Sequence, residues 1–184
     1  MKKFALAATA SLAALSLPSI ANAQEAEVFV GVSGGYHDLG VDGEIEDEFP
    51  GVGIDDGSPI FGAYAGVDVP LGESLFAGVE GNYHIGTSAI DSEYGASLRL
   101  GFQDQGGAKY YLRGGYQEVN FDYAEIIDLE VPAGTYDGLD DTDGDYLVGA
   151  GAEFPLGTNA MLRVNVDTIA FDSARATAGI GFRF

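Results

Sequence analysis

Apolar side chains recur at every second position along most of this 184-residue chain, a period that is typical of β-strands and not of helices. In SEYGASLRLGFQ (92–103), tyrosine, alanine, leucine and phenylalanine alternate with glutamate, glycine, serine and arginine. The pattern predicts an all-β protein in which each strand has one apolar and one polar face. Eight segments show it: 26–37, 60–70, 75–85, 93–103, 109–121, 145–155, 160–171 and 174–184.

The lengths of these segments and of their connections favour a membrane protein. Each predicted strand has about 9–13 residues, which is long for a soluble sheet but is what a tilted strand needs to cross a bilayer. Short turns alternate with longer loops, as in outer-membrane barrels. We therefore expect an eight-stranded antiparallel up-and-down transmembrane β-barrel. The short turns are PLGES (70–74), DQGGA (104–108) and PLGTN (155–159), and the longer loops include 38–59 and 122–144.

The two faces of the strands indicate which side of the barrel meets lipid. The polar face holds many glycines and a few large ions, whereas the apolar face is rich in valine, leucine, tyrosine and phenylalanine. Eight strands enclose room only for side chains, so glycines beside ions suit the lumen and bulky apolar residues suit lipid. Aromatic residues near both strand ends form the expected girdles: Tyr36, Tyr83, Tyr94, Tyr116 and Tyr146 at one end, and Phe102, Tyr110, Phe154, Phe182 and Phe184 at the other.

The N-terminal sequence MKKFALAATASLAALSLPSIANA predicts export. Lys2 and Lys3 precede an apolar run, and Ala21-Asn22-Ala23 forms an A-x-A cleavage site. We expect residues 1–23 to be a cleaved secretory signal peptide and residues 24–184 to form one barrel domain. No later segment has 18 continuous apolar residues, and the chain has no cysteine for a disulfide framework.

The charge of the mature chain excludes some partners. Removing Lys2 and Lys3 leaves six basic residues against 29 acidic ones, a net charge of −23 with both histidines neutral. Such a surface repels nucleic acid and anionic lipid headgroups, so we expect neither as a partner. The 46% apolar content distinguishes the chain from a disordered acidic polypeptide.

The mature chain resembles the opacity-type, OmpX-like small outer-membrane barrels of the porin family. The resemblance rests on the signal peptide, the eight amphipathic strands, the PLG turns, YYLRGGY (110–116) and the terminal GIGFRF. It implies a monomer in the outer membrane of a Gram-negative bacterium, delivered by periplasmic chaperones and the assembly machinery. In that family the machinery reads an aromatic last residue with apolar residues two and four positions before it, and Phe184, Phe182 and Ile180 fit that pattern.

Inward-facing ions are the first candidate site. Six of them fall within about five residues of the predicted periplasmic strand ends, so we expect them to meet in one lumen layer. They form either a network that plugs the barrel, since buried charges must be paired, or a gate whose ion pairs exchange to pass ions. The six are Asp68, Glu80, Arg99, Arg113, Glu153 and Arg163.

The acidic loops 38–58 and 122–145 are the second candidate. Within DDTDGD (140–145), Asp141, Asp143 and Asp145 are spaced two apart around a glycine, which partly resembles a calcium loop but lacks its later bidentate glutamate. The loops are either solvated charge runs or weak sites for Ca²⁺ or Mg²⁺. We expect no other cofactor.

His37 and His84 share the lumen parity near the outer strand ends and are candidates for a proton- or metal-sensitive pair, although two histidines make an incomplete metal site. A lipid-modifying enzyme is the least favoured function, because an acyl chain inside the barrel would need an apolar lumen. A small pore is the alternative that the narrow lumen allows. The favoured interpretation is a non-enzymatic structural or surface-interaction protein that presents acidic loops to an extracellular partner.

Overall fold

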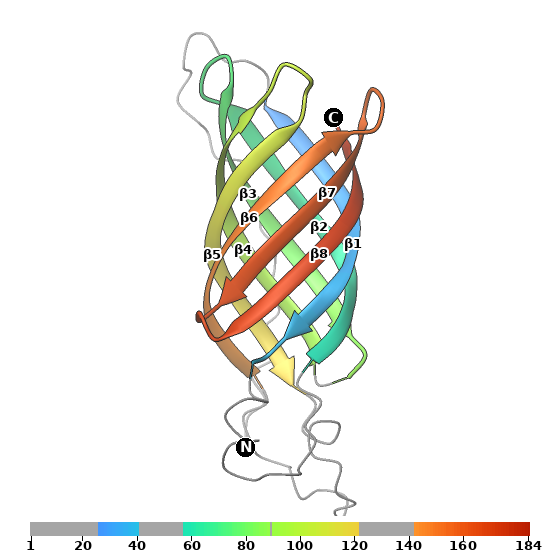
Figure 1. Cartoon of the computed structure of the whole chain (residues 1–184), viewed down its shortest axis with the longest axis vertical. Coiled ribbons are helices and arrows are strands. Elements are labelled where there is room, and N and C mark those ends of the chain that lie inside the picture. The colour runs from blue at the N-terminus through green and yellow to red at the C-terminus, as the bar shows by residue number, and fades with distance from the viewer. Residues whose placement is uncertain (1–25, 41–56, 89, 122–141) are drawn as a thin grey trace, which may run out of the picture.

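The computed structural model describes residues 26–40, 57–88, 90–121 and 142–184. They form a closed barrel in which each strand pairs antiparallel with its sequence neighbours and β1 pairs with β8 (Figure 1). The predicted eight-stranded up-and-down barrel is confirmed. Its strands are β1 (Glu27–Asp38), β2 (Gly57–Pro70), β3 (Leu75–Gly86), β4 (Ile90–Gln103), β5 (Lys109–Phe121), β6 (Thr142–Pro155), β7 (Ala160–Ile169) and β8 (Ser173–Arg183).

The two PLG segments form the same turn at the same end of the barrel. Pro70 ends β2 and Pro155 ends β6, positions where a residue without an N–H costs the ladder nothing. In the first turn the N–H of Leu71 donates to the carbonyl of Leu75 at 2.8 Å, and the second turn repeats the bond from Leu156 to Ala160 at 2.8 Å. The glycine of each turn has a φ of 136° or 104°, which side chains disfavour. This explains why the sequence repeats PLG.

Four strands differ from their predicted bounds by more than one residue: three begin earlier and one ends earlier. Strands β2, β4 and β6 begin three residues earlier than expected, because pairs such as Asp38↔Gly57 and Asn120↔Thr142 continue the ladders past the apolar alternation. Strand β7 ends at Ile169 and not at residue 171, so that prediction is wrong. Ala170 and Phe171 adopt left-handed φ values of 57° and 67°, which turn the chain into β8.

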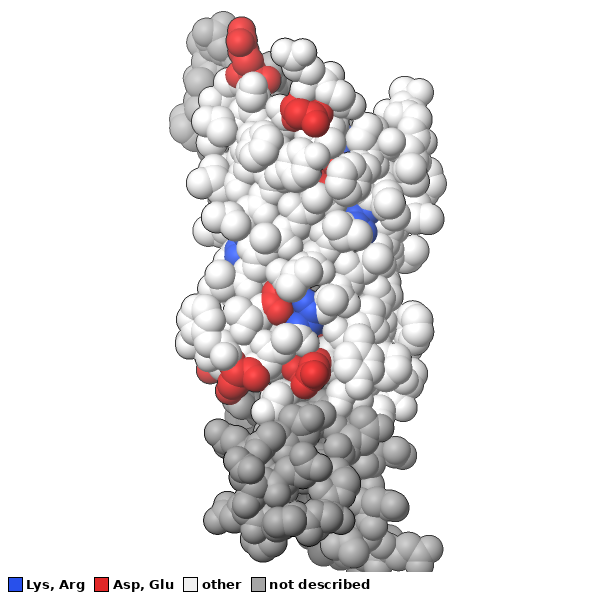
Figure 2. All heavy atoms as spheres, viewed as in Figure 1, with Lys and Arg blue, Asp and Glu red and all other residues white. Residues whose placement is uncertain are grey.

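The barrel is apolar outside and charged inside. Leu98, Leu112 and Val166 are 67%, 70% and 65% exposed on the outer wall, whereas the inward Arg99 and Glu153 are 1% and 0% exposed. Figure 2 shows the consequence: most of the visible surface is uncharged, and acidic atoms gather toward the two ends. All ten residues of the expected girdles are exposed. Because hydrocarbon tolerates this surface and water does not, the fold is that of a membrane barrel.

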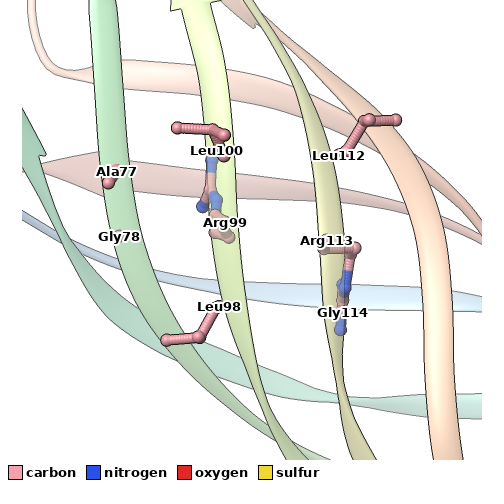
Figure 3. Close-up of a pocket in the computed structure, with 8 residues that line it drawn as sticks. All are labelled: Ala77, Gly78, Leu98, Arg99, Leu100, Leu112, Arg113 and Gly114. Atoms are coloured by element: carbon pink, nitrogen blue, oxygen red, sulfur yellow. The ribbon is translucent and has the colours of Figure 1, made fainter.

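The outer wall carries a shallow hollow over three neighbouring strands. It is lined by side chains of β3, β4 and β5, and Leu98, Leu100 and Leu112 are its large apolar members (Figure 3). Ala77 and Gly114 provide the small side chains between them. None of the residues that the structure describes forms a helix long and apolar enough to cross a membrane.

Candidate functional site: the charged lumen

Every lysine and arginine after residue 23 faces the lumen or its periplasmic mouth. These are Arg99, Lys109, Arg113, Arg163, Arg175 and Arg183, of which the first five are buried. Six carboxylates form ion pairs with them: Glu27, Asp68, Glu80, Glu93, Glu153 and Asp167. The lumen is therefore electrically balanced when both histidines are neutral, and the remaining acidic residues have no cation of the mature chain to pair with.

The first layer of the lumen, the arginine layer, joins four buried residues. Arg99 donates to Glu80 at 3.1 Å and to Glu153 at 2.6 Å. Arg163 donates to the same two carboxylates, each at 2.6 Å. Glu80 and Arg99 come from the neighbouring strands β3 and β4, whereas Glu153 and Arg163 come from β6 and β7. Their bonds therefore connect opposite walls of the barrel.

Aromatic rings surround the arginine layer. The guanidinium of Arg99 lies over Tyr111 at 4.0 Å and over Phe29 at 4.6 Å from the ring centroid. Arg163 lies over Tyr64 at 3.9 Å and over Phe29 at 4.7 Å. Cations prefer the negative face of such rings, so the stacking adds to the ion pairs and fills the space between them. The rings and the two guanidinium groups together occupy this layer of the lumen.

The periplasmic mouth adds a second group of ions. Lys109 bridges Glu27 at 2.5 Å and Asp68 at 2.8 Å, and Asp68 lies 3.7 Å from Arg99. Arg183 of the last strand lies 3.3 Å from Glu153. The mouth and the arginine layer therefore form one continuous network.

The six lumen residues singled out in the sequence all lie in that network. Arg113, the sixth, lies 3.1 Å from Glu80. Sequence reasoning did not single out six further ion-paired residues of the lumen and its mouth, although each has the same inward parity: Glu27, Glu93, Lys109, Asp167, Arg175 and Arg183. Parity was the signal that could have found them.

A third group, the histidine cluster, lies toward the extracellular end. Glu93 is fully buried, and its carboxylate meets His37 Nδ1 at 2.7 Å and His84 Nδ1 at 3.3 Å. Arg175 Nη1 donates to the same carboxylate at 2.5 Å, and its Nη2 donates to Asp167 at 2.9 Å. The two histidines thus meet at a shared carboxylate.

The histidine cluster also brings a serine to each histidine. Ser33 Oγ lies 2.8 Å from His84 Nε2, and Ser173 Oγ lies 3.3 Å from His37 Nε2. A serine that contacts a histidine, which in turn contacts a carboxylate, provides the three groups of a hydrolase triad. Both serines point into the lumen, and Ser173 is also hydrogen-bonded to the carbonyl of Ile169 at 3.1 Å. The sequence analysis missed these contacts because the partners lie 51 and 136 residues apart.

The connection between the arginine layer and the histidine cluster is weak. Among the described residues the only ion pair that joins them is Arg113 Nε to Asp167 Oδ1, at 3.5 Å. Both of these buried atoms are without a hydrogen-bond partner among the described residues, as are Arg113 Nη2 and the hydroxyl of Ser97. This contact is longer than the bonds within the arginine layer, which measure 2.6–3.1 Å.

The acidic loop candidate lies mostly beyond the described residues. Asp141 is outside them, and the side chain of Asp143 is not described. The carboxylate of Asp145 accepts a hydrogen bond from the N–H of Tyr146 at 2.6 Å. Within the described ranges, no group of three or more histidine or acidic side chains is arranged to hold a metal ion. The predicted signal peptide, residues 1–23, is also outside the described residues.

The predicted assembly signal lies on the lipid-facing side of the last strand. Ile180, Phe182 and Phe184 are 50%, 53% and 74% exposed, so none of them contributes a core contact. The N–H of Phe184 donates to the carbonyl of Val28 at 2.9 Å, which continues the β1–β8 pairing to the end of the chain.

Comparison with known proteins agrees with this architecture. A family model of the outer membrane protein beta-barrel domain matches residues 7–184. No curated protein matches the chain. Among solved structures the chain is similar to the N-terminal β-barrel domain of Pseudomonas aeruginosa OprF, with 14% identity, a TM-score of 0.55, and coverage of 88% of this chain and 99% of that chain.

Two further solved structures have the same fold. Ail, the attachment invasion locus protein of Yersinia pestis, is 13% identical with a TM-score of 0.51 and coverage of 86% of this chain and 97% of that one. Neisserial surface protein A is 15% identical with a TM-score of 0.50 and coverage of 88% and 99%. At these identities the likeness concerns the fold alone. Since the family model spans nearly the whole chain, this protein belongs to the outer membrane protein β-barrel domain family and resides in the Gram-negative outer membrane.

Proposed function

We propose that this protein is a non-enzymatic surface protein, whose sealed barrel anchors acidic extracellular loops for contact with an external partner. The observation that carries the proposal is the separation of charge. All six basic residues of the predicted mature chain are at the lumen and its mouth, paired with six carboxylates, so the net charge of −23 belongs to residues outside that network.

The packing of side chains inside the barrel supports an anchoring role. Arg99, Arg163, Glu80 and Glu153 bridge opposite walls with bonds of 2.6–3.1 Å, and aromatic rings pack against both guanidinium groups. Eight-stranded barrels have little internal space even before such a layer forms. An anchor with this interior holds its loops in place without providing a passage.

The distribution of acidic residues in the sequence supports a surface role. Residues 41–56 contain seven acidic side chains and residues 122–141 contain another seven, with no lysine or arginine in either range. Both ranges follow strands that run toward the histidine-cluster end, opposite the short PLG turns. Uncompensated negative charge attracts cationic partners and repels anionic ones.

A small pore is the second candidate function. The 3.5 Å contact between Arg113 and Asp167 and their unpartnered atoms favour it, because a polar, weakly bonded section of lumen is where water would enter. The arginine layer opposes it. Single-channel recording on the refolded protein in planar bilayers separates the two functions. We expect no discrete conductance from the wild type, and stable openings in most insertions would contradict the sealed barrel.

The surface role is tested in cells that display the protein. Residues 41–56 and 122–141 are each replaced by a short Asn-Gly turn, and heat-modifiable gel migration verifies that the barrel still folds. We expect the double replacement to abolish protein-dependent adhesion of the cells to a polycation-coated surface. Equal adhesion with and without the loops would contradict the role of the loops.

The absence of enzymatic activity is tested with a serine-reactive fluorophosphonate. The adjacency of Ser33 and His84 makes Ser33 the nucleophile to examine. We expect no labelling of the folded protein, because Ser33 points into a charged lumen and not toward lipid. Labelling that disappears in Ser33→Ala and in His84→Gln would contradict the proposal and favour a hydrolase.

A further inference from the structure

The hollow over β3, β4 and β5 is an apolar space in the wall that faces lipid (Figure 3). Its volume is about 520 Å³. The outward side chains around it are Leu98, Leu100 and Leu112, each 60–70% exposed. The backbone of Arg99 and Arg113 also lines it, but both side chains are buried in the lumen, so no charged side chain of the lining faces lipid.

Gly114 leaves the hollow open at a position where a side chain would fit. A glycine inside a strand typically marks a bulge, a tight bend, or a place where another backbone or a ligand comes close. Gly114 pairs in regular ladders on both sides, opposite Leu98 and Val148. A Cβ built on it would meet the carbonyl oxygen of Leu147 at 3.8 Å, whereas a Cβ on Gly115 would lie 2.0 Å from a backbone oxygen. Backbone crowding therefore explains Gly115 but not Gly114, which fits the close approach of a ligand.

The hollow lies in the periplasmic half of the membrane. Phe102 and Tyr110 belong to the girdle at the PLG-turn end, and their stacked rings have centroids 5.3 Å apart. The next outward pair on the same two strands is Leu100 and Leu112, which line the hollow. Leu98 follows at about the middle of β4, between the two girdles. A hydrocarbon chain that descends from a headgroup at this girdle would therefore lie along the hollow.

We propose that the hollow is a binding site for one acyl chain of a phospholipid of the periplasmic leaflet. The lipid-facing surface of the outer wall continues into the hollow, so hydrocarbon is what reaches it. An apolar cavity of about 150 Å³ can hold a benzene molecule, so the hollow has room for a long run of methylene groups. A chain in the hollow contacts protein on several sides, whereas a chain on the convex wall contacts it on one. Dispersion attraction grows with the number of such contacts, so the hollow retains a chain longer than the surrounding wall does.

The charges at the periplasmic ends of β3 and β4 select the headgroup of this lipid. Glu73 shortly before β3 and Asp104 directly after β4 are exposed, whereas the cationic Lys109 at the start of β5 is buried. The exposed charge at this edge is therefore negative, which repels an anionic headgroup. The site accordingly takes a zwitterionic phospholipid, of the phosphatidylethanolamine kind.

Photo-crosslinking locates the bound chain. The protein is refolded into phosphatidylcholine vesicles that contain a trace of phosphatidylethanolamine with a diazirine on one acyl chain, and mass spectrometry identifies the labelled residues. We expect β4 and β5 to be labelled severalfold more than β7 and β8. Equal labelling of the outward faces of all strands would overturn the proposal. The same diazirine on phosphatidylglycerol should label the hollow less, and equal labelling by both lipids would contradict the selection of the headgroup.

The position of the diazirine along the chain tests which leaflet supplies the lipid. A diazirine near the headgroup should label the protein next to Leu100 and Leu112, and one near the terminal methyl should label it next to Leu98 and Gly114. The opposite order would show that the chain enters from the extracellular leaflet, where lipopolysaccharide is the source of acyl chains, and would overturn the assignment to a periplasmic phospholipid.

Two variants test the hollow itself. Gly114→Leu fills it, and the new Cβ meets no atom closer than 3.8 Å. We expect this variant to reduce the labelling of β4 and β5 severalfold. Ala178→Leu is the matched control, because Ala178 is exposed on β8, four strands away from β4 around the ring, and should leave that labelling unchanged. Unchanged labelling in Gly114→Leu, with folding verified by heat-modifiable gel migration, would overturn the proposal. If Gly114→Leu does not fold, the distribution of label around the wild-type barrel still decides.

Discussion

Arg99 and Arg163 donate to the same oxygen atom, Oε1 of Glu153, each from a distance of 2.6 Å. They also share Oε2 of Glu80, at 3.1 and 2.6 Å. Two positively charged side chains therefore lie close together in the buried lumen, because each of the two carboxylates binds both arginines. Removal of any one member leaves its neighbours with uncompensated charge, which makes this layer the most sensitive part of the barrel.

Arg99→Ala is expected to destabilise the barrel by about 3–5 kcal/mol, the cost of removing one partner from a buried ion pair. The carboxylates of Glu80 and Glu153 would each lose a donor, and Tyr111 would lose its stacked cation. Equilibrium urea unfolding in lipid vesicles measures the change. Arg183→Ala at the more exposed mouth is the control and should cost less. Wild-type stability in Arg99→Ala would contradict the structural role of the layer.

A double substitution distinguishes charge pairing from packing. Glu153→Gln and Arg163→Met should each be destabilising when made alone, because each leaves an opposite charge without its partner. Together they should cost less than the sum of the single changes, since the pair is then removed as a unit. The same vesicle unfolding assay completes the cycle. Strict additivity would show that the two side chains are energetically independent despite their 2.6 Å contact.

Leu112→Arg tests the apolar outer wall. Leu112 is 70% exposed, so the substitution would be nearly neutral in a water-soluble barrel but should cost about 2–4 kcal/mol when that face meets the middle of a bilayer. Leu71 in the β2–β3 turn is 54% exposed and provides a control near the interface, where about 0–1 kcal/mol is expected. Unfolding from vesicles compares the two variants. Equal costs at both positions would contradict the membrane depth inferred for the wall.

Deletion of Phe184 separates delivery from folding. The side chain is 74% exposed and contributes only a terminal backbone bond to Val28, so refolding in detergent should be nearly unchanged. If the C-terminal aromatic residue serves as the assembly signal, the amount of heat-modifiable protein in outer-membrane fractions should fall severalfold. Phe171→Ala is the matched control, because Phe171 is 69% exposed in the β7–β8 turn. Equal losses in both variants would indicate a general stability effect and not a delivery defect.

The alternation of side chains was sufficient to predict the number of strands, the apolar wall and the inward parity of the ions. This is because a period of two is a local property of an extended chain. The alternation did not predict where β7 ends, because Ala170 and Phe171 continue the apolar pattern but adopt left-handed backbone angles. Apolar residues on the inward face were also missed: Phe29, Tyr64, Phe76 and Tyr111 fill the lumen although large apolar residues were expected outside.

The sequence by itself therefore determined an inside-out, eight-stranded membrane barrel with a charged interior. Only the tertiary structure decided which ions meet, because the partners come from strands that are far apart in the chain, as with Arg99 and Glu153 on β4 and β6. Strand tilt and stagger in the closed ring set those meetings, and no single strand encodes them. The same closure brings Ser173 of the last strand to within 3.3 Å of His37 of the first.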